Sequence, residues 1–350
     1  MPVFPDLCAA LSALLVLAST PLRAGELPDP DGKPADLSKP VRVFILLGQS
    51  NMLGAGRVAG DKPGTLEHAV TTERLYPFLV DEAGDWTERK DVRNVRVMSS
   101  KGGMKVFRNE WMTVKGDKIG PEHGIGHELG NALDAPVMIL KSCIGNRSLG
   151  WDLLPPGSES YQFEDQGKTW VYPAYKGSPL RWEKGSEPEP IGWYAGKQWD
   201  DDIAHARKVL DELDTYYPGA KGHEIAGFFW WQGDKDRYDA GHASRYERNL
   251  VHLIRQLRGA FDAPDAAFVC ATLGQTARGA RGNEGLILDA QLAVDGRSGK
   301  YEEFRGNVAT VYSKPLCHGG SSNGHYGGNA KTYMDVGLAM GKAMLGLLEE

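Results

Sequence analysis

Five short apolar runs constrain the fold of this chain most strongly. Each run is nearly continuous and does not alternate between apolar and polar residues, which is typical of strands buried on both faces. Such strands favour a parallel sheet, because helices must cover both of its sides. The runs occupy residues 41–47, 136–141, 225–231, 266–273 and 307–313.

Helical patterns lie between the runs. Residues 201–214, 244–259 and 329–350 repeat apolar residues at three- and four-residue spacing, so each segment has one apolar stripe. Strands that alternate with helices in this way predict an α/β fold. We expect a three-layer sandwich with a central parallel sheet of about five strands in one domain, residues 41–350.

Two segments interrupt this alternation and are predicted insertions. Residues of about 55–120 are charged and glycine-rich, and residues of about 146–200 are too long for a plain connection. The second segment is rich in tryptophan, which disordered linkers lack, so we expect an ordered cap built on the loops of the sheet. Its tryptophans are Trp151, Trp170, Trp182, Trp193 and Trp199.

The N-terminus has a different composition from the rest of the chain. An apolar run at residues 7–19 is too short to span a bilayer, and small residues and a proline-rich stretch follow it. This pattern predicts a signal peptide at residues 1–24 and a linker at residues 25–40. We expect a secreted or periplasmic protein without stable membrane insertion after processing. The alternative, an uncleaved anchor or a disordered tail, stays open because the first residues contain Asp6 and no lysine or arginine.

Charge and cysteine content exclude several classes of protein. The formal net charge of -6 provides no basic surface for nucleic acid. Beyond the predicted signal peptide only Cys143, Cys270 and Cys317 remain, so at most one internal disulfide can form. His123 and His127 have the spacing of two metal ligands on a helix, but no third ligand group follows them. We therefore expect no metal.

The stretch "FILLGQSNMLG" places a serine at the tip of the first predicted strand. Ser50 follows Leu47 by three residues, where the chain should turn from strand to helix. In doubly wound sheets, ligands bind beyond the carboxyl ends of the strands. A strand-to-helix turn also exposes the hydroxyl and surrounds it with backbone N–H groups. By position alone, however, a helix N-cap is the more common role for a serine such as Ser50.

Four sequence blocks resemble one family. "GQSNM" resembles the nucleophile block of the SGNH hydrolases, in the form found in sialate O-acetylesterase-like and acetyl xylan esterase-like proteins. "KSCIGNRSLGWD" is similar to the second glycine block, and "GFFWWQGDKDR" to the Trp-x-Gln-Gly-acid block. "GHYGGNAKTYMDVGLAMGKAM" is similar to the C-terminal histidine block and the last helix. The blocks occur in the family's order, and the resemblance runs from about residue 41 to the C-terminus.

The resemblance implies a serine esterase mechanism. Ser50 would attack the acyl carbonyl, and His325 would be the base that takes the hydroxyl proton. The oxyanion donors would be the backbone N–H groups of Ser50 and Gly145 and the side-chain amide of Gln232. Water would then release the acid, without a metal or an organic cofactor.

The third catalytic residue departs from the family pattern. Many SGNH enzymes carry an aspartate three residues before the histidine, where this chain has Ser322. Related acetyl xylan esterases can use the acid of the Gln-Gly-Glu block, and Asp234 occupies that position. Asp236 is the alternative acid. A Ser–His dyad assisted by a backbone carbonyl remains open, because aspartate is one methylene shorter than glutamate.

The predicted function is removal of O-linked acetyl groups from carbohydrate, with an acetylated oligo- or polysaccharide as substrate. The tryptophan-rich insertion agrees with this hypothesis, since aromatic rings offer apolar faces to sugars. Two alternatives stay open. One is a catalytically impaired carbohydrate-binding protein on the same fold, and the other is an esterase or lipase for other acyl esters.

Overall fold

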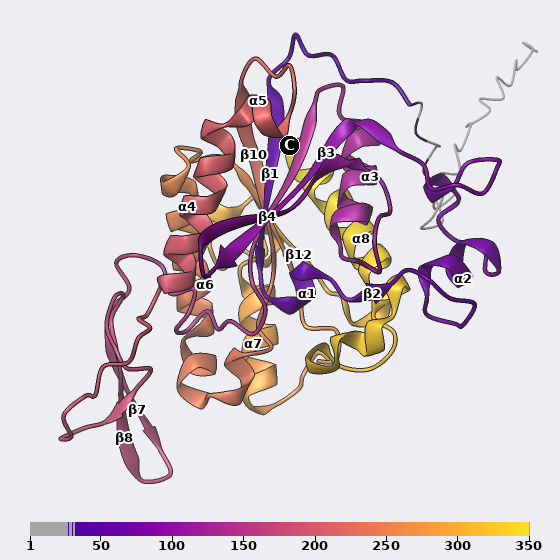
Figure 1. The fold of residues 1–350 in the computed structure, drawn as a ribbon. Helices are drawn as coiled ribbons and strands as arrows, with labels where there is room; N and C mark the ends of the chain where they lie inside the picture. The colour runs from indigo at the N-terminus through magenta and orange to yellow at the C-terminus, as the bar shows by residue number, and fades with distance from the viewer. Residues whose placement is uncertain (1–26, 28–29, 31, 350) are drawn as a thin grey trace, which may run out of the picture.

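The computed structural model describes residues 27, 30 and 32–349, so the predicted signal peptide lies outside the described residues. A seven-stranded sheet forms the centre of the protein (Figure 1). All neighbouring strands are parallel except the last pair, which is antiparallel. In spatial order the strands are β12 (Val308–Val311), β11 (Ala267–Ala271), β10 (His223–Trp231), β1 (Val41–Gly48), β6 (Val137–Ser142), β3 (Arg89–Ser100) and β4 (Gly103–Met112).

The α/β fold with a mostly parallel sheet is confirmed, and each of the five apolar runs contributes one strand. The expected number of about five strands is too low, because β3 and β4 arise inside the segment predicted as the first insertion. In β3, valines alternate with charged and polar residues, and its burial is uneven along the strand. A search for continuous apolar runs finds strands buried on both faces, and it therefore misses a strand of this kind near the edge of the sheet.

Helices cover both faces of the sheet (Figure 1). One face packs against α3 (Glu122–Ala132) and α8 (Ala330–Leu348), and the other against α4 (Lys197–Asp211), α6 (Ala240–Ala260) and α7 (Gly282–Ala293). The shorter helices are α1 (Ser50–Leu53), α2 (Leu66–Thr71) and α5 (Leu213–Tyr216). The remaining turns are the 3-10 helices η1 (Pro77–Leu79), η2 (Asp236–Tyr238), η3 (Gly296–Ser298), η4 (Glu302–Phe304), η5 (Lys314–Leu316) and η6 (Ser322–Gly328).

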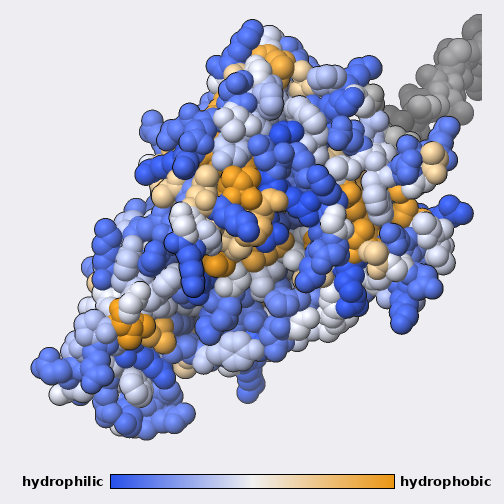
Figure 2. Space-filling view, in the orientation of Figure 1, coloured by the Kyte–Doolittle hydropathy of each residue, from blue (hydrophilic) through white to orange (hydrophobic). Residues whose placement is uncertain are grey.

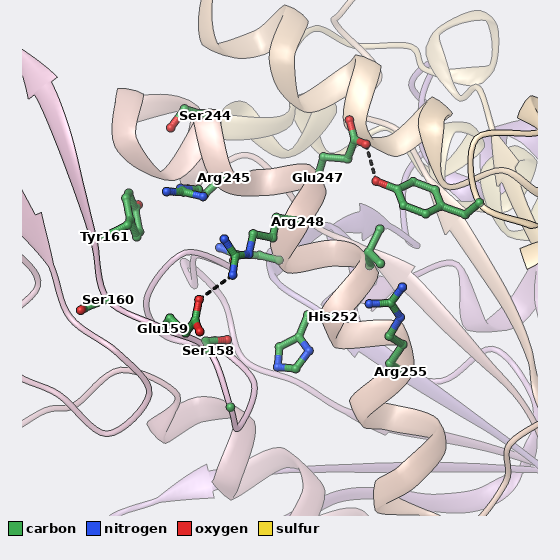
Figure 3. A pocket seen from close by; sticks show the side chains of 14 residues that line it. Ser158, Glu159, Ser160, Tyr161, Ser244, Arg245, Glu247, Arg248, His252 and Arg255 are labelled. Atoms are coloured by element: carbon green, nitrogen blue, oxygen red, sulfur yellow. Dashed lines mark hydrogen bonds and ion pairs between the residues drawn. The ribbon is translucent and has the colours of Figure 1, made fainter. Parts of the chain in front are cut away.

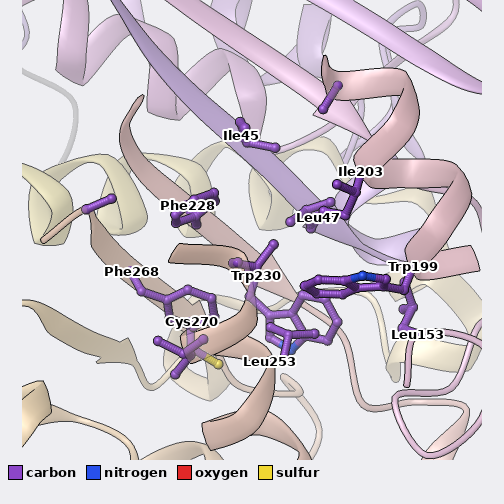
Figure 4. Close-up of a cluster of buried hydrophobic side chains, with 14 of the residues drawn as sticks. Ile45, Leu47, Leu153, Trp199, Ile203, Phe228, Trp230, Leu253, Phe268 and Cys270 are labelled. Carbon is purple, nitrogen blue, oxygen red and sulfur yellow. The ribbon is translucent and has the colours of Figure 1, made fainter. Parts of the chain in front are cut away.

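The core under α4 and α6 shows how the chain fixes its central strand. Leu47 from β1 and Trp230 from β10 lie among side chains of both helices (Figure 4). Trp199 at the start of α4 packs into the same cluster and is buried. The carboxyl end of β1 is therefore held rigidly, which suits a strand that delivers a functional residue.

The second insertion carries a small sheet of its own. Its three antiparallel strands are β7 (Tyr161–Asp165), β8 (Lys168–Tyr172) and β9 (Trp182–Glu183). The hairpin of β7 and β8 projects from the body of the protein in Figure 1. A further two-stranded sheet pairs β2 (Gly56–Arg57) with β5 (Lys118–Ile119) and lies next to α1 in the chain.

The structure contains neither a disulfide nor a membrane-spanning helix among the described residues. Cys143, Cys270 and Cys317 are free cysteines in the structure, so no disulfide joins them. Within the described residues, no helix combines the length and apolar character needed to cross a membrane.

A buried ion pair joins α3 to the sheet beneath α1. Lys141 at the end of β6 is only 1% exposed, and its ammonium lies 2.5 Å from the Glu122 carboxylate. The same ammonium donates to the Leu53 carbonyl at 3.1 Å. Burial acts to raise the pKa of Glu122, but the charges of Lys141 and His123 and the hydrogen bond from Lys141 together lower it. The pair is therefore ionised and fixes the end of α1.

We expect Glu122→Gln to lower the free energy of unfolding by about 3 kcal/mol, because it leaves a buried ammonium without its counter-charge. Urea unfolding followed by circular dichroism would measure the change. Glu302→Gln is the matched control, since Glu302 pairs with Arg305 at the surface and both side chains are exposed. Equal effects of the two substitutions would contradict the assigned role of the buried pair.

Candidate active site

Ser50 lies where the central strand turns into a helix. Gly48 ends β1 with φ +143, and a Cβ there would lie only 2.6 Å from the Trp231 carbonyl oxygen. This close approach of β1 and β10 requires glycine. The chain then enters α1, in which Asn51 and Met52 are buried, while Ser50 is half-buried. The predicted turn thus presents the serine at the carboxyl edge of the sheet.

Gly145 lies directly beside Ser50. A Cβ on Gly145 would be 3.6 Å from the Ser50 Cβ, so the loop after β6 packs against the serine. Ser50 is the first residue of α1, where backbone N–H groups have no intrahelical acceptor. Within the described residues, the N–H groups of Ser50 and Gly145 both lack a hydrogen-bond acceptor. Two unused donors therefore belong to residues that lie side by side at the carboxyl edge of the sheet.

His325 lies in η6, a turn that packs against α1. Both His325 and the following Tyr326 have left-handed backbone angles, with φ of 50 and 51. Tyr326 is fully buried and stacks on Trp231, with ring centroids 5.8 Å apart. Strained backbone of this kind persists only where its surroundings impose it, and it concentrates at functional sites. The His325 ring is half-buried and has no hydrogen-bond partner among the described residues.

Asp234 contacts the histidine turn through Ser322. A turn follows Gly233, and Asp234 contacts the start of η6. The Ser322 hydroxyl donates a short hydrogen bond to Asp234 Oδ1, and Arg237 Nε donates to the same oxygen at 2.9 Å. Asp234 makes no direct hydrogen bond to His325. The serine that replaces the family's aspartate therefore connects Asp234 to the turn that carries the histidine.

Asp236, the alternative acid, points in another direction. It is fully buried, and its two oxygens accept from the backbone N–H groups of Leu149 and Gly150 at 2.9 and 2.8 Å. Burial raises the pKa of Asp236 above its usual value. Among the described residues, none of the hydrogen-bond partners of Asp236 is His325. Its partners show that it anchors the loop after β6.

Gln232 connects the loops that surround Ser50. It is fully buried, and its Nε2 lies 2.6 Å from Asp236 Oδ2, 2.8 Å from the Arg147 carbonyl and 3.1 Å from Gln49 Oε1. Its Oε1 accepts from the Tyr246 hydroxyl at 2.8 Å. An amide nitrogen has two hydrogens, and here it has three acceptors. Donation to an oxyanion would therefore require one hydrogen to leave a present partner.

Basic side chains cover two of the tryptophans in the second insertion. Arg147 lies over the Trp193 ring at 4.6 Å, and Lys197 approaches the same ring at 5.4 Å. Arg181 lies over the Trp170 ring at 4.5 Å. Cation–π contacts of this kind stabilise the loop. Sugar stacking on these two rings, which the sequence suggested, would have to displace the basic side chains.

A cavity of about 570 Å³ lies between α6 and the segment before β7 (Figure 3). Arg248 and Glu159 form an ion pair across it at 2.7 Å, and Arg245 lies over the Tyr161 ring. His252 also lines this cavity, but none of the predicted catalytic residues does. The serine site therefore does not coincide with this hollow.

His123 and His127 serve the packing of α3. Both are buried, and burial lowers the pKa of each. His127 lies against the Phe78 ring, with centroids 4.7 Å apart. Across the described part of the chain, no group of three His, Cys, Asp or Glu side chains gathers in a way that could hold a metal.

Sequence reasoning missed three residues that shape this site. Ser322 was considered as the residue in place of the family's aspartate, three residues before His325, but its contact with Asp234 was not predicted. Arg237 donates to the same Asp234 oxygen as Ser322 does, and it lies with Asp234 in the block "GFFWWQGDKDR". Tyr246 comes from the interior of α6 and had only a helical apolar pattern, which gives no sign of a hydrogen bond to Gln232.

Three solved structures are similar to the chain. A protein from Arabidopsis thaliana is 17% identical, with 88% of this chain and 98% of that chain covered and a TM-score of 0.48. A carbohydrate acetylesterase from Xanthomonas citri is 14% identical, with 86% of this chain and 55% of that chain covered and a TM-score of 0.48. NanS is 15% identical, with 80% of this chain and 78% of that chain covered and a TM-score of 0.41. No curated protein matches the chain.

One family model matches residues 158–346, which is more than half of the 350 residues. The family is described as carbohydrate esterase, sialic acid-specific acetylesterase. The matched segment contains Gln232, Asp234 and His325, and it begins after Ser50 and Gly145. The chain therefore belongs to the sialic acid-specific acetylesterase family of carbohydrate esterases, and it is a carboxylic ester hydrolase that removes O-linked acetyl groups from carbohydrate.

Proposed function

We propose that Ser50 is the nucleophile of this acetylesterase and His325 its base. The packing of Gly145 against Ser50 carries the proposal, because it sets two free N–H donors beside one hydroxyl. Ser50 Oγ attacks the acetyl carbonyl carbon, and His325 takes the hydroxyl proton. His325 then returns that proton to the sugar oxygen as the ester bond breaks. A water molecule, deprotonated by His325, releases acetate from the serine.

The oxyanion of each tetrahedral intermediate would lie between the N–H groups of Ser50 and Gly145. Donors that are fixed before the reaction stabilise developing charge without reorganisation. Gln232 is the third proposed donor, and it also holds the two loops in place through Gln49 and Arg147. These two roles make different predictions, because a donor acts on turnover while a positioning residue also affects the fold.

Asp234 would orient the histidine turn through the Ser322 hydroxyl. Ser322 is fully buried, and its backbone N–H donates to Gln275 at 3.2 Å. Ser322 is therefore fixed from two sides at the start of η6. In this proposal the chain has a Ser–His pair whose histidine turn is positioned by an Asp–Ser contact.

Ser50→Ala should abolish acetate release, with a loss of about 10⁴-fold or more in kcat, because the acyl acceptor is gone. Hydrolysis of 4-nitrophenyl acetate and circular dichroism would measure activity and fold. Ser244→Ala, an exposed serine on α6, is the matched control and should retain wild-type turnover. Near-normal turnover of Ser50→Ala would exclude it as the nucleophile.

Asp234→Asn and Ser322→Ala should each lower kcat and leave KM nearly unchanged, because both disturb the histidine turn and not the substrate. If Asp234 acts through Ser322, the double variant should lose no more than the worse single variant. Kinetics of the four proteins on one ester would complete this cycle. Fully additive losses would mean that the two residues act independently.

Asp236→Asn serves as the comparison for Asp234. We expect it to reduce thermal stability more than Asp234→Asn does, because it removes the acceptor of two backbone N–H groups. A larger loss of kcat in Asp236→Asn, at unchanged stability, would assign the acid role to Asp236.

Gln232→Ala should lower kcat by about 10²–10³-fold with little change in KM, if its amide donates to the oxyanion. A positioning role would instead lower the melting temperature together with kcat, since the contacts of the side chain with Gln49, Arg147, Asp236 and Tyr246 are lost. Measuring both quantities separates the roles. A raised KM at unchanged kcat would contradict both and make Gln232 a substrate contact.

A further inference from the structure

The loop after β11 contacts the histidine turn on both sides of His325. The Ser322 N–H donates to Gln275 Oε1 at 3.2 Å, and Ser322 lies three residues before His325. The Gly274 N–H donates to the Tyr326 hydroxyl at 3.1 Å, and Tyr326 directly follows His325. Two successive residues of one loop therefore bracket the proposed base.

The backbone of the turn needs these contacts. Residues 325–327 all have left-handed backbone angles, with φ of 50, 51 and 62. For His325 and Tyr326, which are not glycine, such angles are unfavourable and persist only where the surroundings impose them. The hydrogen bond that the structure describes for His325 involves its backbone carbonyl and not its ring. The position of the ring therefore follows from the backbone that carries it.

Apolar packing fixes only the part of the turn after His325. Tyr326 is fully buried there. Residues 322–324, before His325, are serine, asparagine and glycine and offer no apolar side chain. Around the turn that precedes α8, Figure 2 shows mainly hydrophilic and near-neutral residues. The start of the turn is therefore fixed by hydrogen bonds, one to Asp234 and one to Gln275.

Gln275 is a fixed support because its own backbone is held. The Lys314 ammonium donates to the Gln275 carbonyl at 2.7 Å. Thr272, in the same loop, is joined to Ser313, whose N–H and hydroxyl donate to the Thr272 hydroxyl and carbonyl at 3.0 and 2.6 Å. Both partners lie in the loop after β12, so the two loops form one unit.

The Gln275 side chain uses its oxygen and not its nitrogen. Oε1 accepts from Ser322, whereas Nε2 is buried and has no acceptor in the part of the chain that the structure describes. A buried donor without a partner is costly, so its presence in a native protein needs an explanation. An apolar side chain of similar length would fill the same space without that cost. Such a side chain would lack the oxygen that faces Ser322.

We infer that Gln275 is a positioning residue for His325. Its Oε1 holds the backbone of Ser322, while Asp234 holds the hydroxyl of the same residue. Together the two contacts determine where the turn begins and hence where the imidazole lies. The inference rests on the proposed role of His325. It adds a support from the loop after β11 to the support that Asp234 provides from the end of β10.

Gln275→Met tests the inference, because methionine is of similar length and has no oxygen. We expect kcat for 4-nitrophenyl acetate to fall about 10–100-fold with KM nearly unchanged, since a displacement of about 1 Å in a catalytic site can cost about 100-fold. Gln275→Glu keeps an oxygen that can accept from Ser322 and should recover part of the lost kcat. Gln162→Met, in the exposed position of β7, is the matched control and should behave as the wild type.

Two results would overturn the inference. One is a wild-type kcat in Gln275→Met, even if its melting temperature falls, because Gln275 would then serve the fold alone. The other is an equal loss of kcat in Gln275→Met and Gln275→Glu, because the acceptor oxygen would then have no role. Circular dichroism would confirm that each variant is folded.

His325→Ala separates this inference from the proposed function. If Gln275 acts through His325, adding Gln275→Met to His325→Ala should cause no further loss of the residual activity. A further loss of about 10-fold or more would show that Gln275 acts elsewhere and would overturn the inference, while the role of His325 would stand. Wild-type turnover of His325→Ala alone would instead contradict the proposed base, and the inference would fall with it.

Discussion

The geometry of the candidate active site depends on one buried amide. Gln232 lies at the end of β10 and contacts the segment before Ser50, the loop after Gly145 and the carboxylate of Asp236. Asp236 in turn holds the backbone of residues 149–150. Gln232 and Asp236 are buried and cannot bond to water, so each must keep its protein partners. Each residue of this network therefore limits the positions that the others can take. The two free N–H donors beside the serine are in place because this network fixes the segments that carry them.

Charge around the site is divided between two sides of α1. On one side, Asp234 binds both Arg237 and the start of the histidine turn. On the other side, Lys141 holds α1 through Leu53, and Arg96 of β3 is in register with Lys141. Helix α1 thus has the acidic Asp234 and the turn of His325 on one side, and the basic Lys141 and Arg96 on the other.

The sequence predicted the parts of this structure that follow from continuous patterns. Leu47 and Trp230 lie in apolar runs that predicted β1 and β10, the two strands that end beside Ser50 and Gln232. Ser50 was predicted from a local signal, the end of an apolar strand, whereas Gly145 was predicted only through the resemblance of its sequence block to a family. The contact between Ser322 and Asp234 joins residues 88 positions apart, and no local pattern encodes such a pair. Strand β3 was missed because its polar residues, Arg96 among them, broke the apolar pattern.

The order of strands determines when the site can form during folding. Strand β1 pairs with β6 and β10, whose residues lie roughly one hundred and two hundred positions further along the chain, so its partners appear late in synthesis. Non-local parallel pairing of this kind folds slowly and leaves the early strand uncovered meanwhile. Tyr326 and the last helix, α8, complete the face against which α1 packs. Ser50, the proposed nucleophile, is thus made early in synthesis, and its surroundings are complete only once the C-terminal helix has been added.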